Sequence, residues 1–215
     1  MLFQDRKDAG HKLAEKLKTL KVGQNAIVLG LPRGGVIVAA AIARDLKLPL
    51  DLIAPRKIGA PGNPELAIGA IAGGESVFFE QLILITNATA QYLEKEIAKE
   101  KEEAKRRLSL YRQGLPPLSI QGKTVVVVDD GIATGATMIA SIRYLRKEGA
   151  SRLIAAVPVG PHDAIEKLQS EGAEPVLLYT PEPFYAVGQF YASFSEVPDS
   201  EVISTLAENH TAVAG

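Results

Sequence analysis

Four consecutive valines, residues 125–128, constrain the fold of this chain more than any other feature. A strand that is apolar on both faces has to be covered on both faces, which is typical of a central strand in a parallel sheet. Other largely apolar runs occur at residues 26–32, 50–55, 152–160 and 174–180, and helical patterns lie between them. Strands that alternate with helices predict an α/β fold with an open, mostly parallel, doubly wound sheet.

Apolar residues at helical spacing predict helices over residues 5–20, from 36 to near 46, from 138 to Gly149, over 163–172 and over 199–210. Residues 66–86 contain three apolar runs that we interpret as two or three short strands. Prolines and glycines between Gly59 and Pro64 predict a loop there.

A long helix is predicted over residues 89–113, which are densely charged but keep an apolar stripe. Glu102 and Glu103 each precede an arginine by four residues, an arrangement that stabilises a largely solvated helix. Three successive bases, Lys105, Arg106 and Arg107, suggest a nucleic-acid patch as an alternative. Five interleaved acids and the lack of an aromatic platform favour a solvated helix face instead.

Composition removes several classes of function. The 215 residues include no cysteine, which excludes disulfides, a thiolate nucleophile and Cys-based zinc or iron–sulfur sites. A net charge of −1 gives no bulk attraction to nucleic acid or to an anionic membrane. The longest apolar stretch is about half of what spans a bilayer, and charges occupy the N-terminal segment. We expect a cytoplasmic protein with no nucleic-acid or membrane partner.

The segment with most chemical information reads VVVVDDGIATGAT, residues 125–137. Its strand delivers Asp129 and Asp130 to the carboxyl end of the sheet, where open α/β sheets bind ligands. The following loop of small residues opens onto a helix, so its amides can hold a phosphate at the helix N-terminus, with hydroxyls of Thr134 and Thr137 beside them. Because that phosphate would repel the two acids, they suit a vicinal diol, provided that the strand turns at Asp130.

Each of these features also has a purely structural explanation. The two acids could cap the next helix, and Arg56 and Lys57 could be ordinary solvated charges. Phe184 and Tyr185 belong to an aromatic cluster that could stack on a base or form the core of a subdomain. The three histidines, His11, His162 and His210, lie on separate elements, which argues against a metal cluster built on them.

The acidic strand end followed by Thr-Gly-x-Thr resembles the phosphoribosyl pyrophosphate motif of the type I phosphoribosyltransferases. The resemblance runs from Leu31 to about Thr180 and implies one domain over residues 1–215. It implies a core over about residues 22–180, with the helix at 89–113 as an insertion. A small hood subdomain would come from about residues 1–21 and 181–215.

The resemblance also implies the roles of individual residues. Asp129 and Asp130 would bind the ribose hydroxyls and take part in catalysis, as would Arg33 and Lys57. The 5′-phosphate loop would be Ala133, Thr134, Gly135, Ala136 and Thr137. The pyrophosphate would contact Arg33, Gly34 and Gly35 after the first strand, and Arg56 and Lys57 in a mobile loop. Phe184 and Tyr185 would form the base pocket.

The activity implied by this resemblance is transfer of the 5-phosphoribosyl group from phosphoribosyl pyrophosphate to a nitrogenous base, with release of pyrophosphate. The implied cofactor is Mg²⁺, carried by the substrate and contacted by Asp129 or Asp130, and a homodimer is the expected assembly. Ala133 and residues 56–59 resemble the corresponding positions of adenine enzymes more than those of 6-oxopurine enzymes. The resemblance therefore favours a purine as the acceptor base. The alternative is a non-catalytic sensor or regulator that keeps the same site.

Overall fold

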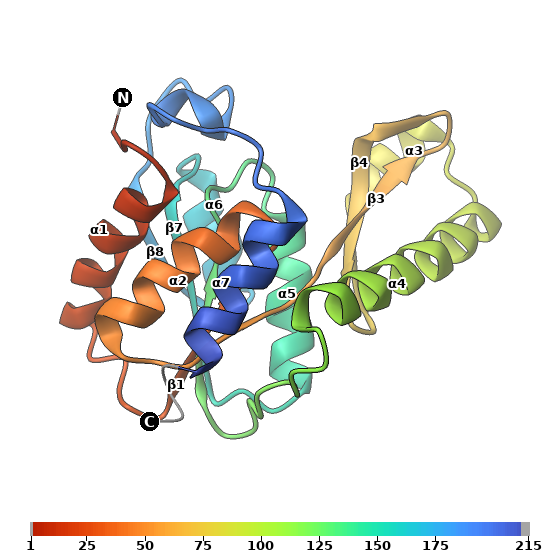
Figure 1. The fold of residues 1–215 in the computed structure, drawn as a ribbon. Coiled ribbons are helices and arrows are strands. Elements are labelled where there is room, and N and C mark those ends of the chain that lie inside the picture. Colours follow the sequence, from red (N-terminus) through yellow and green to blue (C-terminus); the bar gives the residue numbers. More distant parts are fainter. Residues whose placement is uncertain (1, 212–215) are drawn as a thin grey trace.

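A five-stranded parallel sheet in the order β2-β1-β6-β7-β8 forms the centre of the computed structural model, which describes residues 2–211 (Figure 1). The strands are β1 Ala26–Gly30, β2 Leu50–Leu52, β6 Thr124–Val128, β7 Arg152–Val159 and β8 Glu174–Tyr179. The valine strand β6 is central, pairing in parallel with β1 on one side and β7 on the other. This confirms the α/β fold with a mostly parallel sheet.

Helices cover both faces of the sheet, which is why the valine strand has no polar face. Val126 and Val128 pack under α1 (Arg6–Thr19), α2 (Gly34–Leu46) and α7 (Asp199–Thr211). Val125 and Val127 face the opposite layer, formed by α5 (Ala136–Lys147) and α6 (Asp163–Ser170). Helices α1 and α7 lie within the segments that the sequence assigns to a hood, and both contribute buried side chains to this central core.

A second sheet forms an arm that projects from the core (Figure 1). It consists of the antiparallel strands β3 (Arg56–Ala60), β4 (Asn63–Ala72) and β5 (Glu75–Phe78). The loop predicted between Gly59 and Pro64 is therefore wrong in extent, because only the two residues between β3 and β4 lie outside the strands. The register of the hairpin shifts on both sides of Gly59, so the strands accommodate a local sequence that is poor in strand formers.

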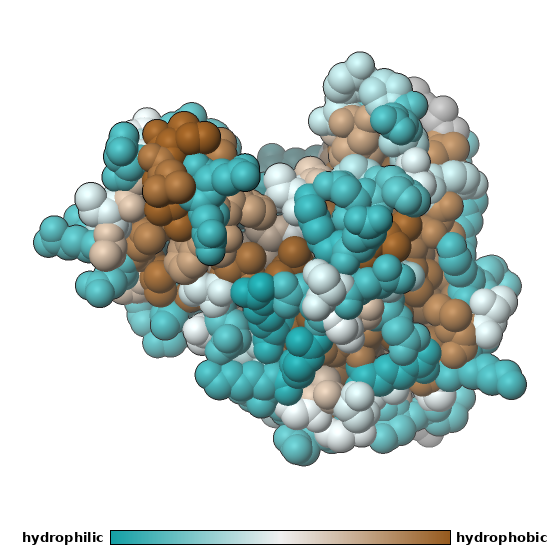
Figure 2. All heavy atoms as spheres, turned by 180° about the vertical axis from the view of Figure 1, so that it is seen from behind, coloured by the Kyte–Doolittle hydropathy of each residue, from teal (hydrophilic) through white to brown (hydrophobic). Residues whose placement is uncertain are grey.

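The apolar run at residues 82–86 belongs to helix α3 (Glu80–Thr86), so the strand predicted there is wrong. A short apolar run has no clear period, and its neighbours decide between helix and strand. Leu82 and Ile83 pack into the core of the arm, whereas Leu84 and Ile85 are 76% and 74% exposed. Figure 2 shows the apolar surface at the outer end of the arm.

Helix α4 (Ala90–Arg112) confirms the predicted long helix and joins the arm to the core (Figure 1). At the arm, the Tyr92 hydroxyl donates to the carbonyl of Gly59 over 2.9 Å. At the core, Arg112 donates to both carboxylate oxygens of Asp51 over 3.0 Å, and the Tyr111 hydroxyl donates to Asp199. The helix is thus held at both ends.

A short 3-10 helix, η1 (Val187–Phe190), lies in the segment between β8 and α7. None of the helices within residues 2–211 combines the length and the apolar character needed to cross a bilayer.

We predict that the ion pair between Asp51 and Arg112 stabilises the fold, because both side chains are largely buried and Asp51 also accepts from the amide of Leu118. Asp51→Asn leaves the guanidinium without a counter-charge and should lower the free energy of unfolding by about 3 kcal/mol in urea titration. Glu102→Gln, which breaks an exposed pair with Lys105, is the control and should change it by less than about 0.5 kcal/mol. Equal effects of the two substitutions would contradict the prediction.

Candidate functional site

The two motif acids lie immediately beyond the central strand. Strand β6 ends at Val128, and the chain bends at Asp130. The amide of Asp130 donates to Oδ1 of Asp129 over 2.9 Å, which holds this bend. Residues beyond the strand need not alternate between its two faces, and binding of one diol by both acids stays a prediction.

Asp130 forms an ion pair with Arg6 of α1, whose Nε lies 2.7 Å from Oδ2. The same guanidinium donates to the carbonyl of Ser195 and lies 3.9 Å from the centroid of the Phe194 ring. Sequence reasoning missed Arg6, since its partner lies 124 positions away and no local pattern marks it. The contact joins the N-terminal helix and the segment before α7 to the acid pair.

Asp129 occupies the most unfavourable position for a charge. Burial raises the pKa of its carboxyl well above the usual range, and the neighbouring Asp130 raises it further. The amide of Asp130 and the positive charge of Lys57 act in the opposite direction. A cation or a diol donor near Asp129 would therefore favour its ionised form.

The glycines of the first strand–helix turn lie against these acids. A methyl group added at Gly35 would lie 2.7 Å from the carbonyl oxygen of Val128 and 2.8 Å from Cα of Asp129. At Gly34 the added atom would collide with the carboxylate of Asp130. Both glycines thus let α2 begin directly beside the end of β6. This packing role is separate from the pyrophosphate contact that the sequence predicts for them.

Arg33 precedes these glycines, and the peptide bond between Pro32 and Arg33 is cis. Its guanidinium forms an ion pair with Glu196 and lies 3.9 Å from Asp199. The side chain is directed to the segment that leads into α7.

A cavity of about 280 Å³ opens beside Asp129. Its charged and hydroxyl-bearing lining residues are Arg56, Lys57, Arg107, Asp129 and Thr137. The apolar ones are Leu31, Pro32, Ala54 and Pro55. The structure thus brings together Arg56, Lys57, Asp129 and one residue of the predicted phosphate loop. Arg56 and Lys57 lie in strand β3, so their predicted place in a mobile loop is wrong. The structure adds Arg107 from α4, which the sequence assigned to a solvated helix face.

The predicted phosphate loop leads into α5, which begins at Ala136 after Gly135 with φ of +82°. The first amides of a helix have no partner within it, and they attract anions together with the helix dipole. Ala133 and Thr134 are exposed and line a more open cavity of about 620 Å³ between the loop, the arm and Lys167. The loop therefore borders both cavities, through Thr137 at the smaller one and through Ala133 and Thr134 at the larger one, and its role in phosphate binding stays a prediction.

The predicted base-pocket aromatics lie apart from the 280 Å³ cavity. Phe184 stacks on Phe190 with 5.4 Å between ring centroids, and Tyr185 is 81% exposed. A third aromatic residue, Tyr191, is buried and donates its hydroxyl to the carbonyl of Asp130 over 2.6 Å. Burial and the nearby Asp130 raise the pKa of Tyr191, so it remains a neutral donor.

Within residues 2–211 no group of three or more His, Asp or Glu side chains is placed to hold a metal ion. Nδ1 of His11 lies 2.7 Å from Asp45, and His162 precedes α6. His210 lies in α7, but its side chain is outside the described part of the chain.

Comparisons with known proteins agree on one family. The family model of the phosphoribosyl transferase domain matches residues 3–173. A Mycobacterium tuberculosis protein whose name places it among the phosphoribosyl transferases is 42% identical over 210 residues, or 97% of this chain and 47% of that protein. This chain therefore spans about half the length of the curated relatives that it matches.

Solved structures support the same fold. The crystal structure of TT1426 from Thermus thermophilus is 44% identical, with a TM-score of 0.82 over 97% of this chain and 99% of that one. A Neisseria gonorrhoeae protein crystallised with ppGpp is 17% identical, with a TM-score of 0.53 over 97% of this chain and 98% of that one. At that identity the second likeness concerns the fold alone.

The close approach at Gly35 predicts that Gly35→Ala destabilises the protein. The added methyl group meets backbone atoms that cannot move independently of β6, so the free energy of unfolding should fall by about 1–3 kcal/mol. Gly74→Ala is the matched control, because no atom lies within 4 Å of the added group, and its effect should stay below about 0.5 kcal/mol. Urea titration measures both, and a Gly35→Ala variant as stable as wild type would refute the contact.

The raised pKa of Asp129 predicts a pH effect on stability. Between the ordinary carboxyl pKa and the raised one, the folded protein holds a proton that the unfolded chain has lost, so the free energy of unfolding falls as pH rises. Asp129→Asn removes this cost and keeps an oxygen for the amide of Asp130. The variant should melt at a higher temperature than wild type at pH 8, with the difference disappearing below about pH 4. An unchanged difference across this range would exclude the titration of Asp129 as its cause.

Proposed function

Because this chain belongs to the phosphoribosyl transferase family, we propose that it transfers the 5-phosphoribosyl group of phosphoribosyl pyrophosphate to a nitrogenous base and releases pyrophosphate. The observation that carries the proposal is the convergence of the acid pair, the phosphate loop and a cation-lined cavity at the carboxyl end of β6. The three parts match the diol, the monophosphate and the diphosphate of one substrate.

The acids and the loop address opposite ends of the sugar phosphate in this proposal. Carboxylates accept hydrogen bonds from hydroxyl groups, so Asp129 and Asp130 suit the 2′ and 3′ hydroxyls. The amides and hydroxyls of residues 133–137 suit the 5′-phosphate. Because Asp130 is already bound to Arg6, its free oxygen is the one that remains for the sugar.

The leaving group would lie on the side of Arg56 and Lys57. Transfer breaks the bond between the anomeric carbon and a pyrophosphate oxygen, and the bonding electrons leave with the pyrophosphate. A bond from the base nitrogen to that carbon replaces it. Cations near the leaving oxygens stabilise the charge that develops there, and Lys57 lines the cavity without an ion-pair partner among the described residues.

Mg²⁺ fits this site only together with the substrate. Asp129 and Asp130 are two adjacent carboxylates, and Mg²⁺ is commonly held by one or two carboxylates plus phosphate oxygens. When bound, it would neutralise negative charge on the pyrophosphate. Asp129 and Asp130 are the side chains that would contact it or its water ligands.

The proposal predicts that the double variant Asp129→Asn, Asp130→Asn loses phosphoribosyl pyrophosphate binding. Removal of two charged acceptors should weaken affinity roughly 100-fold or more in isothermal titration calorimetry with Mg²⁺ present. The control Glu15→Gln removes an exposed acid of α1 and should leave affinity unchanged. Unchanged affinity of the double variant would refute the assignment of the site.

Turnover separates an enzyme from a sensor that keeps the same site. Pyrophosphate release is measured with wild-type protein, phosphoribosyl pyrophosphate and a panel of purine and pyrimidine bases. Release that depends on one base identifies the acceptor and supports transfer. Tight binding of phosphoribosyl pyrophosphate with no release for any base would overturn transfer in favour of a sensor or regulator.

A further inference from the structure

Helix α4 supplies a charged residue to the candidate site that no local motif marks. Arg107 lines the 280 Å³ cavity together with Arg56 and Lys57 of β3, so three cations face one acid, Asp129, in this space. A monophosphate carries at most two negative charges, whereas a pyrophosphate group carries more. Arg56 and Arg107 are each paired with an acid of α4, so their charges are largely balanced. The binding capacity of the cavity for a diphosphate comes from Lys57 and from the N–H donors that the two guanidinium groups keep free.

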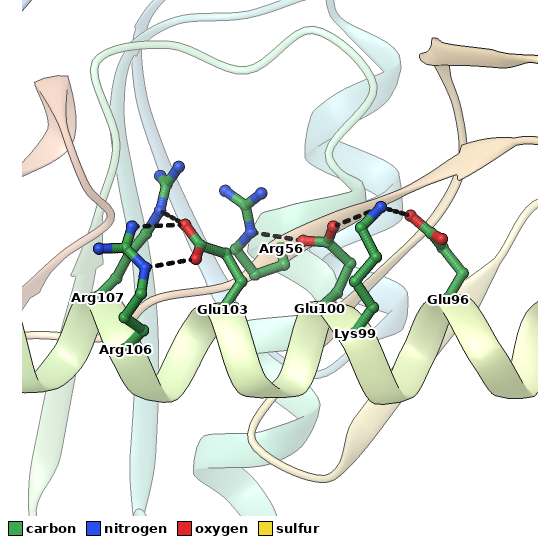
Figure 3. Close-up of polar contacts among 7 residues, drawn as sticks. All are labelled: Arg56, Glu96, Lys99, Glu100, Glu103, Arg106 and Arg107. Atoms are coloured by element: carbon green, nitrogen blue, oxygen red, sulfur yellow. Dashed lines mark hydrogen bonds and ion pairs between the residues drawn. The ribbon is translucent and has the colours of Figure 1, made fainter.

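Arg107 is oriented by an acid on its own helix. Oε1 of Glu103 accepts from Nε of Arg107 over 2.7 Å, and the Arg107 side chain is 29% exposed. Among the residues that the structure describes, Glu103 is the partner of this guanidinium, so its two terminal nitrogens keep their N–H donors. Figure 3 shows these nitrogens extending away from the carboxylate.

Glu103 is well suited to this role because it remains charged. Hydrogen bonds from Arg106 and Arg107 lower the pKa of Glu103 to about 2. The acid therefore holds the guanidinium of Arg107 throughout the neutral pH range.

One turn earlier, the same helix holds the neighbouring cation of the cavity. Oε2 of the buried Glu100 accepts from Nε of Arg56 over 2.6 Å. Residues three apart on a helix share one face, and Figure 3 shows the carboxylates of Glu100 and Glu103 directed to the same side of α4. The helix thus presents two guanidinium groups, one from α4 and one from β3, toward one space.

We propose that Arg107 is a further binding residue for the pyrophosphate group of the substrate and that Glu103 is its positioning residue. The inference rests on the proposed function and extends it to a helix outside the motifs. A guanidinium group matches two phosphate oxygens at once, which suits Arg107 to this task. The 5′-phosphate is assigned to the loop at residues 133–137, in which Thr137 lines this cavity and Ala133 and Thr134 line the other one.

Arg106 provides a matched control on the same helix. It also donates to Glu103, over 2.7 and 2.9 Å, but its side chain is 60% exposed and it does not line the cavity. Exposed pairs of this kind contribute little to stability. If Arg107 served only the helix, replacing either arginine would have the same effect.

The test measures binding of two probes, inorganic pyrophosphate and ribose 5-phosphate, by calorimetry with Mg²⁺ present. Arg107→Gln should weaken pyrophosphate binding about 10- to 100-fold and ribose 5-phosphate binding less than about threefold. Arg106→Gln should change either affinity less than about twofold. Arg107→Lys keeps the charge without the paired donors and should recover part of the loss. Circular dichroism should show the same helix content in all variants.

A double-mutant cycle tests the positioning role of Glu103. Glu103→Gln should weaken pyrophosphate binding in the wild-type background and have no further effect once Arg107 is glutamine. The same substitution should keep its full effect when Arg106 is glutamine. A general structural role of Glu103 would give equal effects in both backgrounds and would overturn this part of the inference.

The outcomes separate this inference from the proposed function. If wild-type protein binds both probes and Arg107→Gln binds pyrophosphate as tightly, the role of Arg107 is refuted and the proposed function stands. If Arg107→Gln lowers the affinity for both probes equally, a pyrophosphate-specific role is also refuted. Wild-type protein that binds neither probe refutes the proposed function together with this inference.

Discussion

The repulsion between two adjacent carboxylates at the end of β6 is the constraint to which much of the molecule is adapted. Arg6 from the N-terminal helix neutralises Asp130, while burial favours the protonated form of Asp129. The Tyr191 hydroxyl donates to the backbone carbonyl of Asp130, and Gly35 lets α2 approach within contact distance. Segments from both ends of the chain thus meet at these two side chains, because an isolated pair of buried acids would be unfavourable.

Most of the central fold was predictable because it depends on local patterns. Consecutive valines indicate a strand covered on both faces, and the alternation of elements indicates a parallel sheet. The helix at residues 80–86 was not predictable, since a five-residue apolar run fits a strand equally well and only packing against β4 decides. The strand predicted from residue 66 lies in β4, whereas β3 and the first residues of β4 were missed because the bulge at Gly59 admits glycine at a position where a regular strand disfavours it.

The part of the candidate site that is contiguous in the sequence was predictable. The residues that only the fold brings to the site were not. Asp129 and the loop to Thr137 are contiguous, so spacing alone indicates their chemistry. Arg6 and Arg107 lie far from the motif in sequence, and only the packing of α1 and α4 brings them to it. Glu100 takes part through Arg56, to which it is bound. Periodicity placed the 89–113 helix correctly, but it could not indicate which side of that helix borders a cavity.

Helix α4 is fixed at both ends, by Tyr92 at the arm and by Arg112 at the core. Between these ends, Glu100 and Glu103 hold Arg56 and Arg107, the two arginines that line the cavity. Each residue added to a helix advances it by about 1.5 Å and rotates everything beyond by about 100°. A single insertion would therefore turn one anchored end away from its partner, whereas about seven residues, close to two full turns, would restore the facing. Insertions into α4 are therefore expected to come in whole helical turns. The distance by which the arm extends from the sheet can then take only a few discrete values.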